Sequence, residues 1–177
     1  MKTFFFFGIC LLILLFSCEN DLETIRKVTY KSSDPVERTT GLKLHYTDSG
    51  FAKVELNARL AESYSKPIKV VKLKDGVKVK FFNSSGEVES ILTSLYGEIR
   101  GEGEMMVRDS VRLFNIKMGQ RLETEELFWN QKTEAINTER SVIVRSKDGV
   151  FFGDGIRTTQ DFLKYEFIKP RGKIKLN

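Results

Sequence analysis

The sequence predicts an all-β domain built from many short antiparallel strands. Three observations predict this fold class. Apolar and polar residues alternate with a period of two in several segments, as in a strand with one buried face. After residue 17 the chain holds 13 Val, 10 Ile and 11 Thr but only four Ala, a composition that favours sheet. Glycine-containing turn signals recur at short intervals, and no segment after residue 18 has a sustained helical period.

The first 17 residues are predicted to be a targeting segment and not part of the fold. Lys2 is followed by an uncharged apolar run at positions 4–16. As a helix this run would extend about 20 Å, short of the roughly 30 Å hydrocarbon core of a bilayer. A signal-peptide core therefore fits better than a membrane span.

The end of this segment resembles the bacterial lipobox. Cys18 follows Leu15, Phe16 and Ser17 and precedes the polar run 19–21. The resemblance implies that residues 1–17 are a lipoprotein signal peptide and that Cys18 becomes an acylated N-terminus. The alternative is an ordinary cleaved signal with a chance cysteine. Several acyl chains would anchor the mature chain far more firmly than one.

The cysteine content fits this interpretation. Cys10 and Cys18 are the only cysteines in the chain. After cleavage and acylation no free thiol remains, so we expect a mature protein without disulfides that relies on its core alone.

The mature chain is predicted to have a tether and one β-domain. Residues 18–40 are polar and are expected to form a tether with a short ordered piece near Val36; residues 41–177 are expected to form the domain. Alternation predicts strands at 42–47, 51–60 and 77–81, and turn signals are present at 48–50, 74–76, 83–86, 147–149 and 171–172. The segments 101–103 and 153–155 are predicted to be bulges or bends.

Composition limits the chemistry available to the chain. The net charge of +5 is too small, and its signs too mixed, to indicate nucleic-acid binding. His45 is the only histidine, which excludes metal binding by a histidine pair, and the loss of free thiols excludes cysteine catalysis. We expect no cofactor, no metal and no enzymatic activity. A hydrolase with two catalytic carboxylates stays open, with candidates at Asp109, Glu123, Glu125, Glu126, Glu139 and Asp154.

An ordered set of motifs covers residues 107–174. It consists of a strand that ends at Asn115, a turn at Gly119, the run 122–129 with the pattern L-x-T-x-x-L-x-W, the strand 136–138, and the late glycine pair at 153–155. In this order the motifs resemble the LptC and OstA-like family of lipopolysaccharide-export proteins. The N-terminal half, 42–103, matches more loosely. Family members often use an uncleaved membrane helix, whereas this chain has the lipobox.

The resemblance implies a twisted, open β-jellyroll with an apolar groove. A non-enzymatic carrier of this kind would be periplasmic and lipid-anchored, at the inner rather than the outer membrane. It would take lipopolysaccharide from an inner-membrane ABC transporter and hold the lipid A acyl chains in the groove. Its edge strands would pair with another OstA-like periplasmic protein, forming a bridge toward the outer membrane.

Alternation also predicts which side chains face the groove. The expected inward side chains are Leu56, Val79, Phe81, Ile91, Val111, Leu113, Leu122, Leu127, Val142, Val144, Phe152 and Phe167. Lining a groove and filling a closed core require the same side chains, so each of them could equally be plain core. Lys78, Lys80 and Arg112 are candidates for contacts with lipid phosphates. The rival interpretation is a structural or adhesive β-rich surface lipoprotein that binds protein or glycan.

Overall fold

The computed structural model describes residues 34–48, 50–101 and 103–175. They belong to one compact unit, Ser33–Asn177. The predicted signal peptide, Cys18 and most of the predicted tether lie outside the described residues. Within the described residues, no helix has the length and apolar character needed to cross a membrane.

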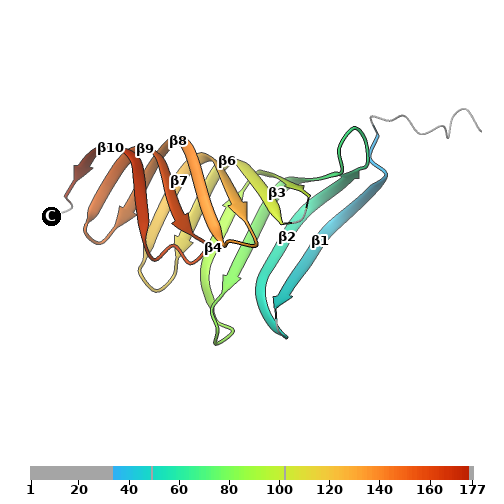
Figure 1. Ribbon diagram of the computed structural model, residues 1–177, viewed down its shortest axis with the longest axis horizontal. Coiled ribbons are helices and arrows are strands. Elements are labelled where there is room, and N and C mark those ends of the chain that lie inside the picture. The colour runs from blue at the N-terminus through green and yellow to red at the C-terminus, as the bar shows by residue number, and fades with distance from the viewer. Residues whose placement is uncertain (1–33, 49, 102, 176–177) are drawn as a thin grey trace, which may run out of the picture. The chain divides into compact units, whose positions relative to one another are not determined.

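The described residues form one antiparallel sheet, which confirms the all-β prediction (Figure 1). Its ten strands are β1 (Glu37–Asp48), β2 (Phe51–Tyr64), β3 (Val70–Phe82), β4 (Val88–Ser94), β5 (Tyr96–Arg100), β6 (Glu104–Asn115), β7 (Gln120–Asn130), β8 (Ala135–Ser146), β9 (Gly149–Thr159) and β10 (Tyr165–Ile174). The strand order is β1-β2-β3-β4-β6-β7-β8-β9-β10, and β5 pairs with β3 and β6. Strands β4 and β5 thus occupy one position in the sheet.

The first strand starts earlier than the sequence predicted. β1 begins at Glu37, inside the segment 18–40 that was predicted as a tether. Arg38 and Thr39 pair with Glu62 and Ala61 of β2, and the N–H of Val36 donates to the Ser63 carbonyl at 2.8 Å. The polar character of this stretch hid the strand, because its side chains are mostly exposed at the edge of the sheet.

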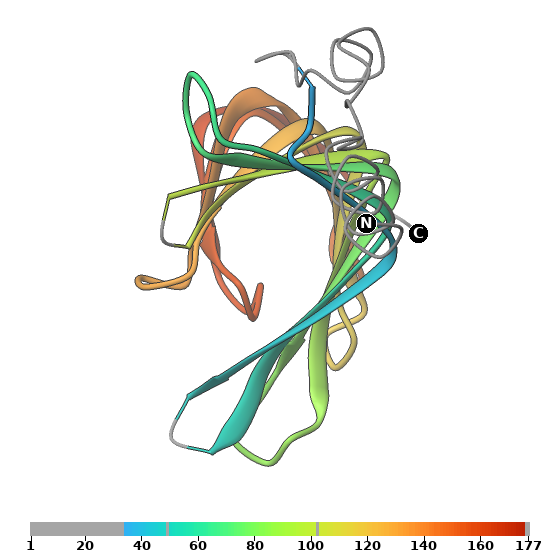
Figure 2. The ribbon, with the colours of Figure 1, turned by 90° about the vertical axis from the view of Figure 1, so that its right-hand side faces the viewer.

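The sheet bends along a line of backbone irregularities (Figure 2). The pairing register shifts at this line between β2 and β3, β6 and β7, β7 and β8, and β8 and β9. Asp75, Asp109, Ser110 and Gly155 have φ values of 63°, 67°, 55° and 77° there. Bulges bend a strand and increase its twist. Aligned across the sheet, they divide it into two walls.

Peptide groups at the bend still find partners. The N–H of Gly76 donates to the Leu95 carbonyl at 3.1 Å, and the N–H of Leu95 donates to the Asp109 carbonyl at 2.9 Å. The predicted turn at 74–76 is therefore a bend within β3, and the one at 171–172 lies within β10 beside a register shift. Residues that favour hairpin turns also favour bulges, because both need unusual backbone angles.

The bend gives each long strand one half in each wall. Wall 1 consists of 42–48, 51–58, 77–82, 88–94, 111–115, 120–124, 141–146 and 149–154, and wall 2 of 37–40, 60–64, 70–74, 96–100, 104–108, 126–130, 135–138 and 156–159. Apolar side chains on their facing surfaces form the core. The rings of Phe81 in wall 1 and Trp129 in wall 2 meet edge to face, 5.3 Å apart.

A short connection crosses the open side of this angle. Residues 160–164, here called the strap, follow the end of β9 in wall 2 and reach across to wall 1 (Figure 2). Asn115 at the far end of β6 donates through Nδ2 to the Asp161 carbonyl at 2.6 Å. The strap inserts Phe162 into the core, where none of its surface is exposed.

Candidate functional site

An apolar cavity opens between the two walls near β1. We call it the N-terminal groove; its volume is about 180 Å³ and it is lined by Leu44, Tyr46, Val54, Leu56, Ile99, Gly103, Met105, Trp129 and Gln131. Wall 1 contributes the residues from β1 and β2, and wall 2 contributes those from β5, β6 and β7. Concave sites with mostly apolar linings are the usual form of lipid and small-molecule sites.

The groove is open because β1 is an edge strand. Leu44 pairs with Leu56 and Tyr46 pairs with Val54, so both side chains lie on the same face as the core. Leu56 and Val54 are buried, whereas Leu44 is 45% and Tyr46 is 43% exposed. Among the described residues, β1 has only β2 as a neighbour. The inner face of wall 1 therefore ends in apolar side chains that reach solvent.

Trp129 forms the inner limit of the groove. Its ring packs against Phe81 on one side, and its Nε1 donates to Gln160 Oε1 of the strap at 3.2 Å. Both Trp129 and Gln160 are buried. A polar bond at this depth fixes the indole, since a buried N–H without an acceptor is costly.

Most of the predicted groove residues lie on the inner face but away from the opening. Leu56 lines the groove, and Phe167, in β10, is partly buried against the core. The others on the inner face are buried in the core: Val79, Phe81, Val111, Leu113, Leu122, Leu127, Val142 and Val144.

Two of the predicted inward residues lie on the outer face. Ile91 pairs with Lys80 and Phe114, and its neighbours Ser90 and Leu92 point inward and are buried. Phe152 lines a surface hollow on the outside of wall 1. Both belong to pairs of adjacent apolar residues, where alternation alone does not identify the inner face.

The candidate phosphate contacts also lie outside. Lys78 and Arg112 each sit between two buried inner-face neighbours and are exposed. Lys80 is held by Glu55, with Nζ 2.8 Å from Oε1. None of these three lines the N-terminal groove.

Sequence reasoning missed the two residues that open the groove. Leu44 and Tyr46 belong to the alternating segment 42–47, so the strand was predicted correctly. Their exposure depends on β1 being an edge, and strand order is a long-range property that periodicity does not contain. An apolar alternating strand next to a polar predicted tether was the available signal.

Comparison with known proteins identifies no family for this chain. No family model matches the chain, and no curated protein matches it significantly. The LptC and OstA-like resemblance rests on the motifs alone and remains a prediction.

The outer face of wall 1 carries ion pairs around single carboxylates. The carboxylate oxygens of Glu55 lie 2.8 Å from Lys80 Nζ, 3.1 Å from His45 Nε2 and 3.4 Å from Lys43 Nζ. The hydrogen bond from Lys80, with others from Asn57 and His45, holds the pKa of Glu55 far below its ordinary value. His45 thus belongs to a surface charge cluster.

Several of the candidate hydrolase carboxylates are similarly paired with arginine. The pairs are Glu123 with Arg121 at 3.1 Å and Arg145 at 3.2 Å, Glu126 with Arg140 at 3.3 Å, and Asp154 with Arg171 at 3.2 Å. Ion pairs of this kind are common between side chains on a solvated strand face.

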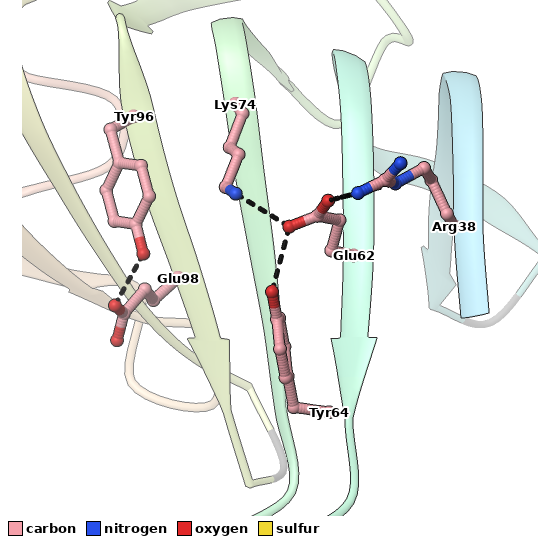
Figure 3. Close-up of polar contacts among 6 residues, drawn as sticks. All are labelled: Arg38, Glu62, Tyr64, Lys74, Tyr96 and Glu98. Carbon is pink, nitrogen blue, oxygen red and sulfur yellow. Dashed lines mark hydrogen bonds and ion pairs between the residues drawn. The ribbon is translucent and has the colours of Figure 1, made fainter. Parts of the chain in front are cut away.

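The outer face of wall 2 holds a more buried carboxylate (Figure 3). Glu62 accepts hydrogen bonds from Lys74 Nζ at 2.6 Å, the Tyr64 hydroxyl at 2.9 Å and Arg38 Nη2 at 2.6 Å, and its side chain is only 3% exposed. These bonds, with that of Lys74 the largest, lower the pKa of Glu62 to about 2. The contacts tie β1, β2 and β3 together.

A second tyrosine–glutamate pair lies beside it on β5. The Tyr96 hydroxyl donates to Glu98 Oε1 at 2.7 Å, and Arg108 lies over the Tyr96 ring at 4.4 Å. Burial and then the bond to Glu98 raise the pKa of Tyr96 to about 12. Each tyrosine–glutamate pair lies within one strand, and the cationic side chains of Arg38, Lys74 and Arg108 connect the pairs to neighbouring strands.

The Glu62 cluster predicts a loss of stability in acid. Because the pKa of Glu62 is lower in the folded than in the unfolded chain, its contribution is present above pH 4.5 and is lost as pH falls toward 2. We expect Glu62→Gln to cost about 1–2 kcal/mol of unfolding free energy at pH 7 and to flatten the acid dependence. Urea titrations between pH 2 and pH 7 measure both effects.

The control for this prediction is Glu125→Gln. Glu125 is an exposed carboxylate on β7. It should leave both the stability at pH 7 and the acid dependence nearly unchanged. An equal response from the two variants would show that the Glu62 contacts do not contribute to stability.

Proposed function

We propose that the chain is a non-enzymatic lipid carrier that binds acyl chains of lipopolysaccharide in the N-terminal groove. In this proposal it takes lipopolysaccharide from an inner-membrane ABC transporter and passes it toward the outer membrane. It does so in the periplasm, where the acylated Cys18 holds it to the membrane. The observation that supports the binding step is the solvent-exposed apolar inner face formed by Leu44 and Tyr46 at the groove opening.

The chemistry of the groove suits a hydrocarbon chain. Apart from Gln131, its lining side chains are aliphatic, aromatic or thioether groups, with Gly103 as backbone. Burying apolar surface that is otherwise in water contributes about 25 cal/mol per Å². An acyl chain would gain this from Leu44 and Tyr46, whereas a sugar or peptide would leave polar groups without partners.

The edges of the sheet suit pairing with another β protein. Among the described residues, β1 is a 12-residue edge strand without proline, and an edge strand of this kind can accept an added strand through its backbone. Both edge strands have a register shift, between Tyr46 and Thr47 in β1 and between Pro170 and Gly172 in β10, but only β10 contains a proline, Pro170, which has no N–H. A proline on an edge strand protects it from pairing. We therefore place the OstA-like or transporter partner at β1.

Photo-crosslinking tests the binding step. A benzoylphenylalanine at Tyr46 of the full chain, in cells that make lipopolysaccharide, should form a lipopolysaccharide adduct on irradiation. The matched control is the same group at Ile91, on the outer face of wall 1, where we expect no adduct. Absence of an adduct at both Tyr46 and Leu44 in the folded protein would contradict the proposal.

The packed half of the domain supports a second candidate function. Around the strap the inner face is filled by its own side chains, as expected for a structural or adhesive lipoprotein that binds protein or glycan on its surface. That function predicts no envelope defect when the protein is depleted. Failure of lipopolysaccharide to reach the outer membrane after depletion would favour the carrier instead.

A further inference from the structure

The strap separates the inner face into an open part and a closed part. On the β1 side, Leu44 and Tyr46 leave the N-terminal groove open to solvent. On the β10 side, Phe162 of the strap occupies the space between the walls with none of its surface exposed. A ligand chain that moved from β1 toward β10 would have to displace this ring.

Buried side chains fasten the strap to wall 1. Ser90 Oγ donates to the Gln160 carbonyl, Asn115 Nδ2 donates to the Asp161 carbonyl at 2.6 Å, and Gln120 Nε2 donates to the Phe162 carbonyl. Ser90, Asn115 and Gln120 are themselves buried. Lifting the strap would leave these donors without acceptors, and each buried unpaired group costs about 1–3 kcal/mol.

The strap is also fastened to wall 2. The N–H of Gln160 donates to the Glu134 carbonyl at 2.9 Å, and Thr158 Oγ1 donates to the Lys164 carbonyl at 2.6 Å. Since both walls hold the strap, it behaves as part of the fold and not as a loosely attached lid.

Aromatic side chains fill the space beyond the strap. The Phe162 and Tyr165 rings are 5.6 Å apart, and the Tyr165 and Phe167 rings are also 5.6 Å apart. A side chain added at Gly153 would collide with the Phe167 ring, so this ring lies directly on the β9 backbone. These rings therefore keep the inner face closed from the strap to β10.

The open part is small for a lipid site. Its volume of about 180 Å³ is below the roughly 300–1,000 Å³ of typical ligand pockets. That space accommodates part of a hydrocarbon chain and excludes the bulk of a multi-chain lipid.

We infer that the N-terminal groove is one-ended: it takes the terminal part of an acyl chain through the β1 edge and releases it through the same edge. This inference rests on the proposed function, and it replaces a path of the acyl chain along the whole inner face with entry and exit at one edge. Loading and release would both take place at β1, where the inner face is open, and the strap would be a fixed stop.

Native-state hydrogen exchange of the full chain tests whether the strap is fixed. The amides of Gln160 and Phe162, which donate to Glu134 and Thr159, should exchange within about threefold of a core amide such as that of Leu113. Exchange more than about tenfold faster, with the core still protected, would show a strap that opens locally and would overturn the inference. This measurement needs no ligand.

Crosslinking at the two ends of the inner face tests the route. With benzoylphenylalanine at Tyr46 or at Phe167, we expect lipopolysaccharide adducts at Tyr46 only. Adducts at Phe167 would overturn the one-ended groove while leaving the carrier proposal intact. Adducts at neither position would count against the carrier proposal, and hydrogen exchange would still decide whether the strap is fixed.

Discussion

Phe162→Ala is expected to lower the unfolding free energy by about 3–5 kcal/mol, the usual range for deleting a fully buried phenylalanine ring. The ring has no exposed surface and stacks on Tyr165. Its removal leaves a cavity between the walls that the strap cannot close, because its carbonyls are held by Asn115 and Gln120. The effect should therefore approach the full cost of the cavity.

Urea denaturation measures this loss, and Leu163→Ala is the matched control. Leu163 is the next residue of the strap but is 40% exposed. We expect its replacement to change stability by less than about 1 kcal/mol. A similar loss in the two variants would mean that Phe162 is not a core residue. A changed slope with urea in Phe162→Ala would indicate loosening of the whole β10 side.

Gly155→Ala is expected to cost about 2–3 kcal/mol. Gly155 has a φ of 77° at the bend of β9, where a side chain is strained by about 1–2 kcal/mol. An added Cβ would also lie 3.0 Å from the Thr138 carbonyl oxygen and 2.7 Å from Ile168 Cδ1. The backbone oxygen cannot move without disturbing the pairing of β8 with β9.

Gly172→Ala is the control for the bend. Gly172 also lies next to a register shift, in β10, but an added Cβ there meets no atom within 4 Å and its φ is not in the left-handed region. Thermal unfolding should show a clear drop in Tm for Gly155→Ala and almost none for Gly172→Ala. Equal behaviour would mean that the glycine in the 153–155 motif is not needed for the bend.

Local pattern was sufficient to predict the all-β fold, the strands at 42–47, 51–60 and 77–81, and the inward direction of most of the nominated side chains. Alternation in 51–60 identified Leu56 as inward, and its side chain is buried. It failed for Ile91 and Phe152 because each has an apolar neighbour, so the period of two does not choose a face. The turn signal at 74–76 was interpreted as a hairpin turn, whereas it is a bend within β3, because the same residue types favour turns and bulges.

The groove opening and the strap could not be predicted in this way. The contact between Ser90 and the Gln160 carbonyl joins residues 70 apart in sequence. Residues 160–164 carry no periodic signal, and Phe162 there forms only a short apolar pair with Leu163 between polar residues. Likewise, the exposure of Leu44 and Tyr46 follows from strand order. Both features depend on which distant segments become neighbours.

The aligned bulges have a mechanical consequence. A bend that crosses the sheet at one level acts as a hinge, because small changes in backbone angles can be shared among the strands. The strap clamps this hinge between β4 and β9 but not at β1 and β2. The angle between the two walls should therefore change more easily near β1 than near β10, where the strap holds the walls together. The end of the sheet that is softest is also the end where the apolar face meets solvent.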